Sequence, residues 1–289
     1  MKKIIILIPV FNDWDSLKKL LFEISKNIND LNEVVFNCII INDASTTDYS
    51  EINKPKNFES LKILNMKLNK GHAQCNAFGI KYIFENEKFD NILLMDGDGE
   101  DRPEELRDLV NQVLKYPNFS VVAKRTKRSE NFIFKFLYRI HKLITLIFTG
   151  KIINFGYFSC LAKKDVEKIV SLPSLKSSYS GTFKKNIKRY NAIKSIRGIR
   201  YFGPSKMPLT KLLIHSFSII AVFKHRVFLS SFLYLLILNL MDLSSSIVAI
   251  FQILIIIFCF IIFLTSLRSK KEELYNSHEN LENIKDIMH

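Results

Sequence analysis

Apolar runs and polar turns alternate along the first half of the chain. Short, continuous apolar runs are typical of strands buried on both faces of a sheet. The expected strands span residues 4–10, 34–41, 61–66, 92–95 and 120–125. A helix is expected from Asp15 or Ser16 to about Ile28, and another follows Asn69-Lys-Gly-His72 and ends near Glu85. Strands alternating with helices at this spacing predict an α/β fold with a mainly parallel sheet.

The second half of the chain is richer in long apolar segments. Residues 247–267 contain no charged residue and have about the length of a bilayer span. Residues 227–241 are shorter than a comfortable span, and they cross only with snorkelling of Lys224 and Arg226 and local thinning. Basic clusters, 224–226 and 268–271, flank the two segments, so a hairpin puts both on the cytoplasmic face, whereas a single span separates them.

This patterning predicts four parts, in a protein of the cell (inner) membrane that crosses the bilayer more than once. Residues 1–208 form the α/β domain, on the cytoplasmic side. Residues 209–226 form an interfacial amphipathic helix, because polar residues are interspersed in an apolar run. Residues 227–267 form a transmembrane hairpin, and 268–289 form a polar cytoplasmic tail with no evident site. Homo-oligomerisation through the hairpin is left open.

Charge narrows the choice of partners. The formal net charge is +14, and no Asp or Glu occurs from Lys168 to Met241. Such a basic block favours phosphate-bearing partners; the alternative is that the charge serves only to keep the protein soluble. A nucleic-acid partner is not expected, because the block lies beside hydrophobic segments and no nucleic-acid module is visible. Four cysteines without metal-ligand or disulfide spacing suit a reducing compartment.

The densest candidate chemistry lies where the fourth expected strand ends. Asp96, Asp98, Glu100 and Asp101 place four acids within six residues. Carboxylates at this density suit Mg²⁺ or Mn²⁺, which complete their coordination with substrate phosphates. A solvated acidic turn is the alternative. The expected ends of two other strands carry residues 9–13 and 42–43, so three polar clusters converge on one sheet edge, where such sheets bind ligands.

These clusters resemble four ordered motifs of the GT-A glycosyltransferases of family 2. The resemblance is closest to the polyprenyl-phosphate (dolichol-phosphate mannosyltransferase-like) branch, and it covers about the first 106 residues. Ile-Pro-Val-Phe-Asn-Asp is similar to "hPxYNE", Ile-Asn-Asp-Ala-Ser-Thr-Thr-Asp to "VDDGSxD", and Leu-Asn-Lys-Gly-His-Ala-Gln to "N-x-G-x-x-A". Met-Asp-Gly-Asp-Gly-Glu-Asp-Arg-Pro-Glu-Glu-Leu is similar to "DADLQDPPEEL".

The resemblance implies a Rossmann-like nucleotide-sugar domain and assigns roles to individual residues. The base and ribose of the donor would be held by Pro9, Phe11, Asp13 and Asp43. Lys70, Gly71 and Gly97 would also belong to the donor site. Asp96 and Asp98 would form the DxD pair that carries the metal. Glu100 stands where Gln is usual, as a third ligand or a solvent-facing acid; Asp13 replaces Glu, and Asn42 replaces an acid.

Basic residues complete the implied site. Arg125 matches an arginine near the donor phosphates, and Arg139 matches one that binds the acceptor phosphate. Arg139 lies in a helical stripe with Lys135 and Lys142, which is either a solvated face or a cationic track for a lipid phosphate. Residues 199–211 resemble "R-x-x-G-x-SKY", which makes Arg200, Ser205 and Lys206 candidates for phosphate contacts.

The expected activity is inverting transfer of one sugar from a UDP- or GDP-sugar to a polyprenyl phosphate. Hydroxyl acceptors need a general base, yet residues 177–188, where many family members carry one, contain no acid. The runner-up is transfer to a lipid-linked or glycan hydroxyl in surface polysaccharide synthesis, with Asp165 or Glu167 as base. An inactive membrane-anchored scaffold is the third hypothesis. A processive synthase is disfavoured, since Trp14 is the sole tryptophan and "QxxRW" is absent.

Overall fold

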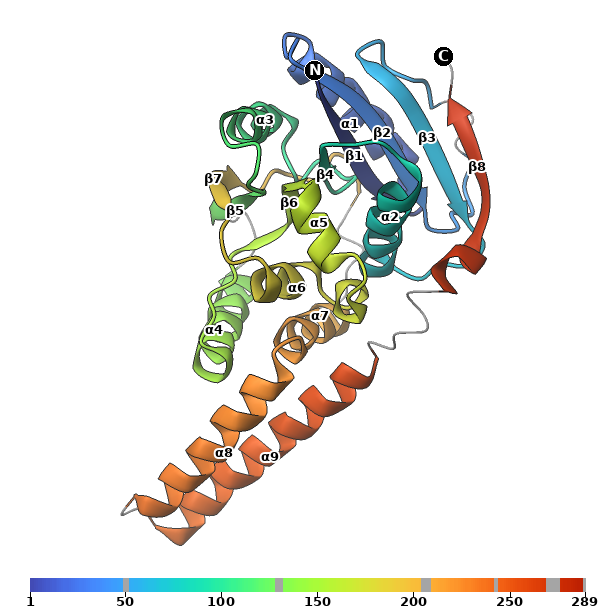
Figure 1. The fold of residues 1–289 in the computed structure, drawn as a ribbon. Coiled ribbons are helices and arrows are strands. Elements are labelled where there is room, and N and C mark those ends of the chain that lie inside the picture. The colour runs from blue at the N-terminus through green and yellow to red at the C-terminus, as the bar shows by residue number, and fades with distance from the viewer. Residues whose placement is uncertain (49–51, 128–131, 204–208, 242–243, 269–275, 288–289) are drawn as a thin grey trace.

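The computed structural model describes residues 1–48, 52–127, 132–203, 209–241, 244–268 and 276–287. Within them, eight strands form one mixed sheet in the order β7-β5-β6-β4-β1-β2-β3-β8 (Figure 1). The strands are β1 Lys2–Val10, β2 Val34–Asn42, β3 Phe58–Met66, β4 Asn91–Leu94, β5 Val121–Lys127, β6 Phe155–Ala162, β7 Asn191–Ile196 and β8 Leu281–Ile287. Strands β1 to β4 are mutually parallel, whereas β6 and β8 run against their neighbours.

Helices cover both faces of this sheet because β1 alternates its side chains between two cores. Ile4, Ile6 and Ile8 pack with α1 (Trp14–Ile28) and α3 (Leu106–Lys115). Ile5 and Leu7 point to the other face, which α2, α5 and α6 cover. The bounds of these three helices are His72–Asn86, Lys163–Ile169 and Tyr179–Asn186. The predicted α/β architecture with a mainly parallel sheet is therefore confirmed.

Further helices flank this domain or project from it on the side of α6 (Figure 1). Helix α4 (Phe132–Thr149) follows β5, and α7 (Leu209–Ala221) packs against α6 and meets α8 (Lys224–Leu240) at a sharp bend. The axis turns by 85° between residues 212–221 and α8. The predicted interfacial helix over residues 209–226 differs from the structure, because α7 ends at Ala221 and α8 begins three residues before the predicted Val227.

Helices α8 and α9 (Ser245–Leu267) lie side by side and extend away from the sheet (Figure 1). Helix α9 is long and apolar enough to cross a bilayer, and only 6% of its most apolar stretch is buried. The bent pair of α7 and α8 would make a second span if it counts as one. Between α8 and α9, Asn239 Oδ1 accepts a hydrogen bond of 3.1 Å from the side-chain amide nitrogen Nε2 of Gln252.

The C-terminal tail differs from its prediction as a polar segment with no evident role. Leu281–Ile287 forms β8, which pairs antiparallel with β3 at the edge of the sheet. A 3₁₀ turn, Asn276–Asn280, precedes it. Four of the seven residues of β8 are polar and most of its side chains are exposed, so its stability comes from backbone pairing rather than from an apolar face. The chain thus returns from α9 into the sheet.

Candidate active site at the carboxyl edge of the sheet

Three loops meet where β1, β2 and β4 end. Val10 lies beside Asn42 in the register of β1 and β2, and Leu7 lies beside Leu94 in that of β1 and β4. Asp43 N donates to Val10 O at 2.9 Å. A Cβ atom at Gly97 would lie 3.1 Å from Pro9 O, so the loop after β4 approaches β1 closely. The polar clusters predicted to converge at this edge do so.

Asp43 organises the donor side of this edge. It is buried, and its two carboxylate oxygens accept from Lys70 N and Gly71 N, each at 2.8 Å. Gly71 has φ +86°, a backbone conformation that favours glycine, and α2 begins at the next residue. In this structure Asp43 therefore fixes the loop before α2, and the Lys70 side chain is exposed.

Asn12 joins the loops after β1 and β2, and sequence analysis assigned it no role. Its Oδ1 accepts from Thr46 N at 2.8 Å, and its backbone N donates to Ser45 Oγ at 2.9 Å. Its φ of +50° is tolerated by asparagine better than by most residues. Phe11 beside it is 41% exposed, which leaves an aromatic face open at the edge.

The four acids of residues 96–101 each face a cationic side chain. His72 Nε2 lies 2.7 Å from Asp96 Oδ1, and Arg125 Nη2 lies 3.3 Å from Asp101 Oδ1. Arg200 bridges two acids, since Nη1 donates to Asp98 Oδ2 at 2.9 Å and Nη2 pairs with Asp13. A further ion pair joins Arg197 and Glu100. The carboxylates therefore lie together, balanced by cationic side chains from three segments, α2, β5 and residues 197–200.

Burial and the closeness of the acids shift the pKa values of the carboxyl groups in this cluster. Burial raises the pKa of Asp98 to about 6, and the charges of Asp96 and Glu100 add to the shift. Burial, with the charge of Asp96, raises the pKa of Asp101 to about 7. Burial also opposes ionisation of Asp96, but His72, followed by Arg125 and Arg197, outweighs it and lowers that pKa to about 2. Carboxyl groups that keep their protons near neutral pH do so because their negative charges would repel one another, and a bound cation relieves that repulsion.

Residues 197–202, called here the basic strap, run along the acidic loop. Gly198 N donates to Glu100 O at 2.8 Å, and Tyr201 N donates to Asp98 O at 2.9 Å. The Tyr201 ring lies where a side chain at residue 99 would project: a Cβ there would be 2.6 Å from the ring. Gly99, with φ +87°, therefore allows both the turn and the packing. The strap delivers Arg200 to the expected metal pair.

The donor set fits a divalent metal with few protein ligands. No group of three or more His, Cys, Asp or Glu side chains within the described residues is arranged to hold a metal. Asp96 and Asp98 still supply two oxygen ligands at one edge, which suffices for a cation that takes its other ligands from phosphates and water. Glu100 pairs with Arg197 and would have to leave it to reach a metal, so its ligand role stays a prediction.

Of the predicted basic residues, only some lie at the acidic cluster. Arg125 reaches the cluster, but Arg139 is exposed on α4 and makes no hydrogen bond or ion pair with the described residues. Ser205 and Lys206 lie outside the described residues. His72, Asn12, Arg197 and Tyr201 were missed, although His72 directly follows the glycine of a recognised motif.

The alternative general bases are wrong in position. Strand β6 runs antiparallel to β4, with Ala162 beside Asn91 and Ser159 beside Leu94. Asp165, three residues beyond Ala162, therefore lies at the end of the sheet opposite Asp96. It is also buried and accepts from Ser120 Oγ at 2.8 Å. Glu167 lies on the same helix, so neither residue reaches the candidate site.

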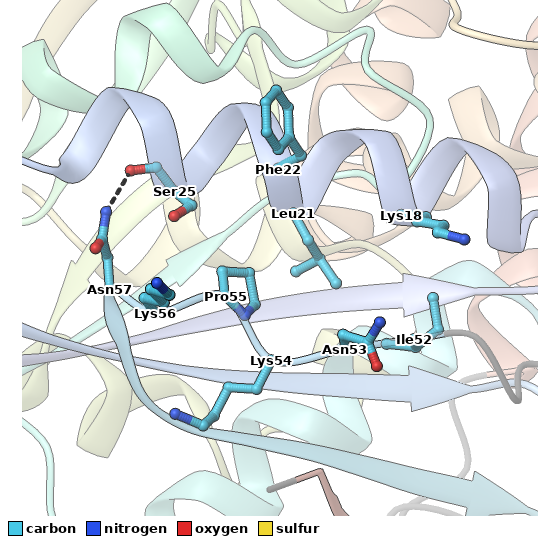
Figure 2. A pocket seen from close by; sticks show the side chains of 10 residues that line it. All are labelled: Lys18, Leu21, Phe22, Ser25, Ile52, Asn53, Lys54, Pro55, Lys56 and Asn57. Carbon is cyan, nitrogen blue, oxygen red and sulfur yellow. Dashed lines mark hydrogen bonds between the residues drawn. The ribbon is translucent and has the colours of Figure 1, made fainter. Parts of the chain in front are cut away.

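A pocket of 410 Å³ lies elsewhere, between α1 and residues 52–57 (Figure 2). Three lysines, Lys18, Lys54 and Lys56, surround an apolar floor that includes Leu21 and Pro55. None of the residues that line it belongs to the acidic cluster, and Lys54 Nζ already donates to Phe58 O at 3.2 Å. The pocket therefore lies apart from the acidic cluster.

The mixed sheet, with an acidic loop at the carboxyl edge of its parallel strands, has the fold of the GT-A glycosyltransferases. The chain belongs to glycosyl transferase family 2, whose pattern matches residues 5–170, more than half of its length. No curated protein gives a match to this sequence.

Solved structures share the fold at low sequence identity. One is glucosyl-3-phosphoglycerate synthase from Mycobacterium tuberculosis with Mn²⁺, UDP-glucose and phosphoglyceric acid. It is 15% identical, with a TM-score of 0.52, over 78% of this chain and 80% of that one. Another is S. aureus TarS 1–349 with UDP-GlcNAc, at 15% identity and a TM-score of 0.50, over 85% of this chain and 69% of that one. Both likenesses concern the fold.

Proposed function

We propose that this enzyme transfers one sugar from a UDP- or GDP-sugar to a polyprenyl phosphate at the cytoplasmic face of the membrane. Mg²⁺ or Mn²⁺ would be held by Asp96 and Asp98. The main support is the position of the two apolar helices in the chain: α8 and α9 lie between β7 and β8, which are both strands of the catalytic sheet. In the same domain, the basic strap lies against the acidic loop. The membrane-facing part and the sugar-transfer site thus belong to one folded unit.

Membrane attachment is supported by exposure as well as by composition. A long apolar helix in a water-soluble protein buries its side chains, yet α9 exposes apolar residues along its length. Chain tracing favours two crossings. Because β8 pairs with β3 in the catalytic sheet, the segment after α9 returns to the side from which α8 departed. The hydrogen bond between Asn239 and Gln252 suits a helix pair in lipid.

Loss of the nucleoside diphosphate builds negative charge, and the residues at the edge can balance it. Arg200 is positioned as a donor to phosphate oxygens once Asp98 engages the metal, and Arg125 lies at the same cluster beside Asp101. A bound divalent cation would supply Lewis-acid stabilisation of the leaving diphosphate. UDP-sugars are supported as donors, since the synthase and TarS complexes contain UDP-glucose and UDP-GlcNAc.

A phosphate acceptor is supported by the positions of the acids. A phosphate anion can attack without losing a proton, whereas a hydroxyl needs a base within hydrogen-bond reach. Asp165 and Glu167 lie at the far end of the sheet, and the acids near the edge already face cations. Arg139, exposed on α4, remains the proposed contact to the acceptor phosphate.

The test uses membranes that contain the full chain, labelled UDP- and GDP-sugars with Mn²⁺, and three acceptors: polyprenyl phosphate, polyprenol and a lipid-linked glycan. Label is expected in polyprenyl phosphate alone. Asp98→Ala should lower the rate about 100-fold or more, because an electrostatic contact to the leaving group is lost. Asp108→Ala, an exposed acid on α3, is the matched control.

Transfer to polyprenol or glycan would instead establish the hydroxyl-directed alternative. The scaffold hypothesis predicts neither transfer nor donor hydrolysis by the wild-type chain, with no difference in Asp98→Ala.

A further inference from the structure

Three asparagines lie side by side across the strands at the donor edge. Asn42 on β2 is in register with Asn65 on β3, and Asn65 is in register with Asn283 on β8. Asn42 Nδ2 donates to Asn65 Oδ1 at 2.8 Å, and Asn65 Nδ2 donates to Asn283 Oδ1 at 2.6 Å. The first two are each only 6% exposed. We call these three residues the asparagine row.

The inner end of the row shapes the loop after β2. Asn42 Oδ1 accepts from Ser45 N at 2.9 Å, and Ser45 Oγ in turn accepts from Asn12 N at 2.9 Å. Asp43 lies between Asn42 and Ser45 and holds the loop before α2. Asn42 stands where the family carries an acid, and a carboxylate there would lack the N–H that Asn42 donates to Asn65.

A second contact joins the C-terminal segment to the loop before α2. Asn280 Oδ1 accepts from Leu68 N at 3.0 Å, and Asn280 Nδ2 donates to Leu68 O at 3.0 Å. The backbone O of Asn280 accepts from Lys67 N at 2.7 Å. Two residues further on, Lys70 and Gly71 give their amides to Asp43. Both loops at the donor edge are therefore braced by residues after α9.

We propose that residues 278–287 are a positioning element of the nucleotide site, with Asn283 and Asn280 fixing the two loops that receive the nucleoside. The chain reaches these residues only after α8 and α9, so donor affinity depends on a segment that the apolar hairpin delivers. The inference requires that the chain bind a nucleotide diphosphate, and it does not depend on which acceptor is used.

The direction of the hydrogen bonds makes the idea testable at one residue. Asn283 acts toward Asn65 only as an acceptor, so Asn283→Asp keeps the contact, whereas Asn283→Leu keeps the bulk and loses it. Loss removes the hydrogen bond that Asn65 Nδ2 donates, beside the buried Asn42. Glu282→Gln is the matched control, because adjacent strand residues point to opposite faces.

Binding of UDP and of GDP, each with Mn²⁺, is measured by titration calorimetry on the full chain in detergent micelles. Asn283→Leu should raise the Kd of the nucleotide that binds by about threefold to tenfold, the effect of one hydrogen bond. Asn283→Asp and Glu282→Gln should stay within about twofold of wild type. Melting midpoints are recorded for each variant, and a variant already unfolded at the titration temperature is replaced by Asn283→Ser.

Hydrogen exchange gives a readout that needs no ligand. Asn280→Ala should speed exchange of the Leu68 amide and of the Lys70 and Gly71 amides, while the amides of α3 keep the wild-type rate. Equal Kd values for wild type and Asn283→Leu, or unchanged exchange in Asn280→Ala, would overturn the inference alone. If neither nucleotide binds the wild-type chain, donor use and the inference fail together.

Discussion

At the scale of single residues, cationic side chains offset the repulsion among the acids of residues 96–101, which lie too close together for distance to reduce it. Asp96, Asp98, Glu100 and Asp101 would repel one another, but each faces His72 or an arginine. A divalent cation can take over that balance only by displacing Arg200 from Asp98 and by removing the protons that crowding retains. Metal binding is therefore coupled to pH.

The pH prediction concerns stabilisation by Mn²⁺. The pKa values of Asp98 and Asp101, about 6 and 7, lie above the ordinary carboxyl value, so the metal-free folded state binds more protons than the unfolded chain. Its stability therefore falls as pH rises through 6 to 7, and the raised pKa of His72 acts in the same direction. Mn²⁺ should raise the melting midpoint by a few degrees more at about pH 8 than at about pH 5.5.

Differential scanning calorimetry of the full chain, with and without Mn²⁺, measures this difference. Asp98→Ala should reduce it, since one crowded carboxyl is removed. An equal Mn²⁺ shift at both pH values would show that protons and metal do not compete at this cluster.

At the scale of elements, the basic strap and the acidic loop are two segments that each depend on the other. The strap contributes two backbone hydrogen bonds and the Tyr201 ring, and the loop contributes the space above Gly99. Arg200 reaches Asp98 only while this packing holds, so the backbone contact sets the position of the charge. A substitution at Gly99 should therefore displace Arg200 from Asp98 through the strap.

Gly99→Ala tests this coupling. The added Cβ meets the Tyr201 ring at 2.6 Å and also strains a residue with φ +87°. Gly150→Ala is the matched control, because Gly150 has φ +64° and nothing within 4 Å of its Cβ position. Both should lose about 1 kcal/mol from backbone strain. Gly99→Ala should lose more and should also weaken sugar transfer by about tenfold.

The excess should vanish in a double-mutant cycle with Tyr201→Ala, measured by denaturant unfolding and by transfer rate. Additive effects of the two substitutions would mean that the ring and Gly99 are not coupled.

How far the sequence predicts this molecule depends on how local each feature is. Strands β1, β2 and β4 are continuous apolar runs, and the acids of the DxD loop are neighbours in the chain, so patterns of a few residues predict them. The tail strand β8 is polar and largely exposed, which gives no periodicity to detect. Arg200 and Asp98 are 102 residues apart, so only folding reveals their contact.

At the scale of the whole molecule, the sheet constrains how the hairpin can enter a membrane. Strand β8 belongs to the catalytic sheet, so in the proposed membrane arrangement the chain leaves and returns on one side of the bilayer, which requires an even number of crossings. A single crossing by α9 would leave β8 on the opposite side and remove the outermost strand. One crossing and two crossings differ in the side of the bilayer on which the connection between α8 and α9 and the C-terminal tail are exposed.

Single cysteines decide between them. Ser244→Cys lies between α8 and α9, Glu282→Cys lies on β8, and Lys115→Cys lies on α3 of the catalytic domain. All three positions are exposed, and the native Cys38, Cys75 and Cys160 are buried. In intact cells, an impermeant maleimide should label Ser244→Cys alone, because two crossings place it opposite both other positions. Lys115→Cys and Glu282→Cys should react together once the membrane is opened. Labelling of Glu282→Cys in intact cells would require β8 to leave the sheet, and the proposed link between hairpin and nucleotide site would be lost with it.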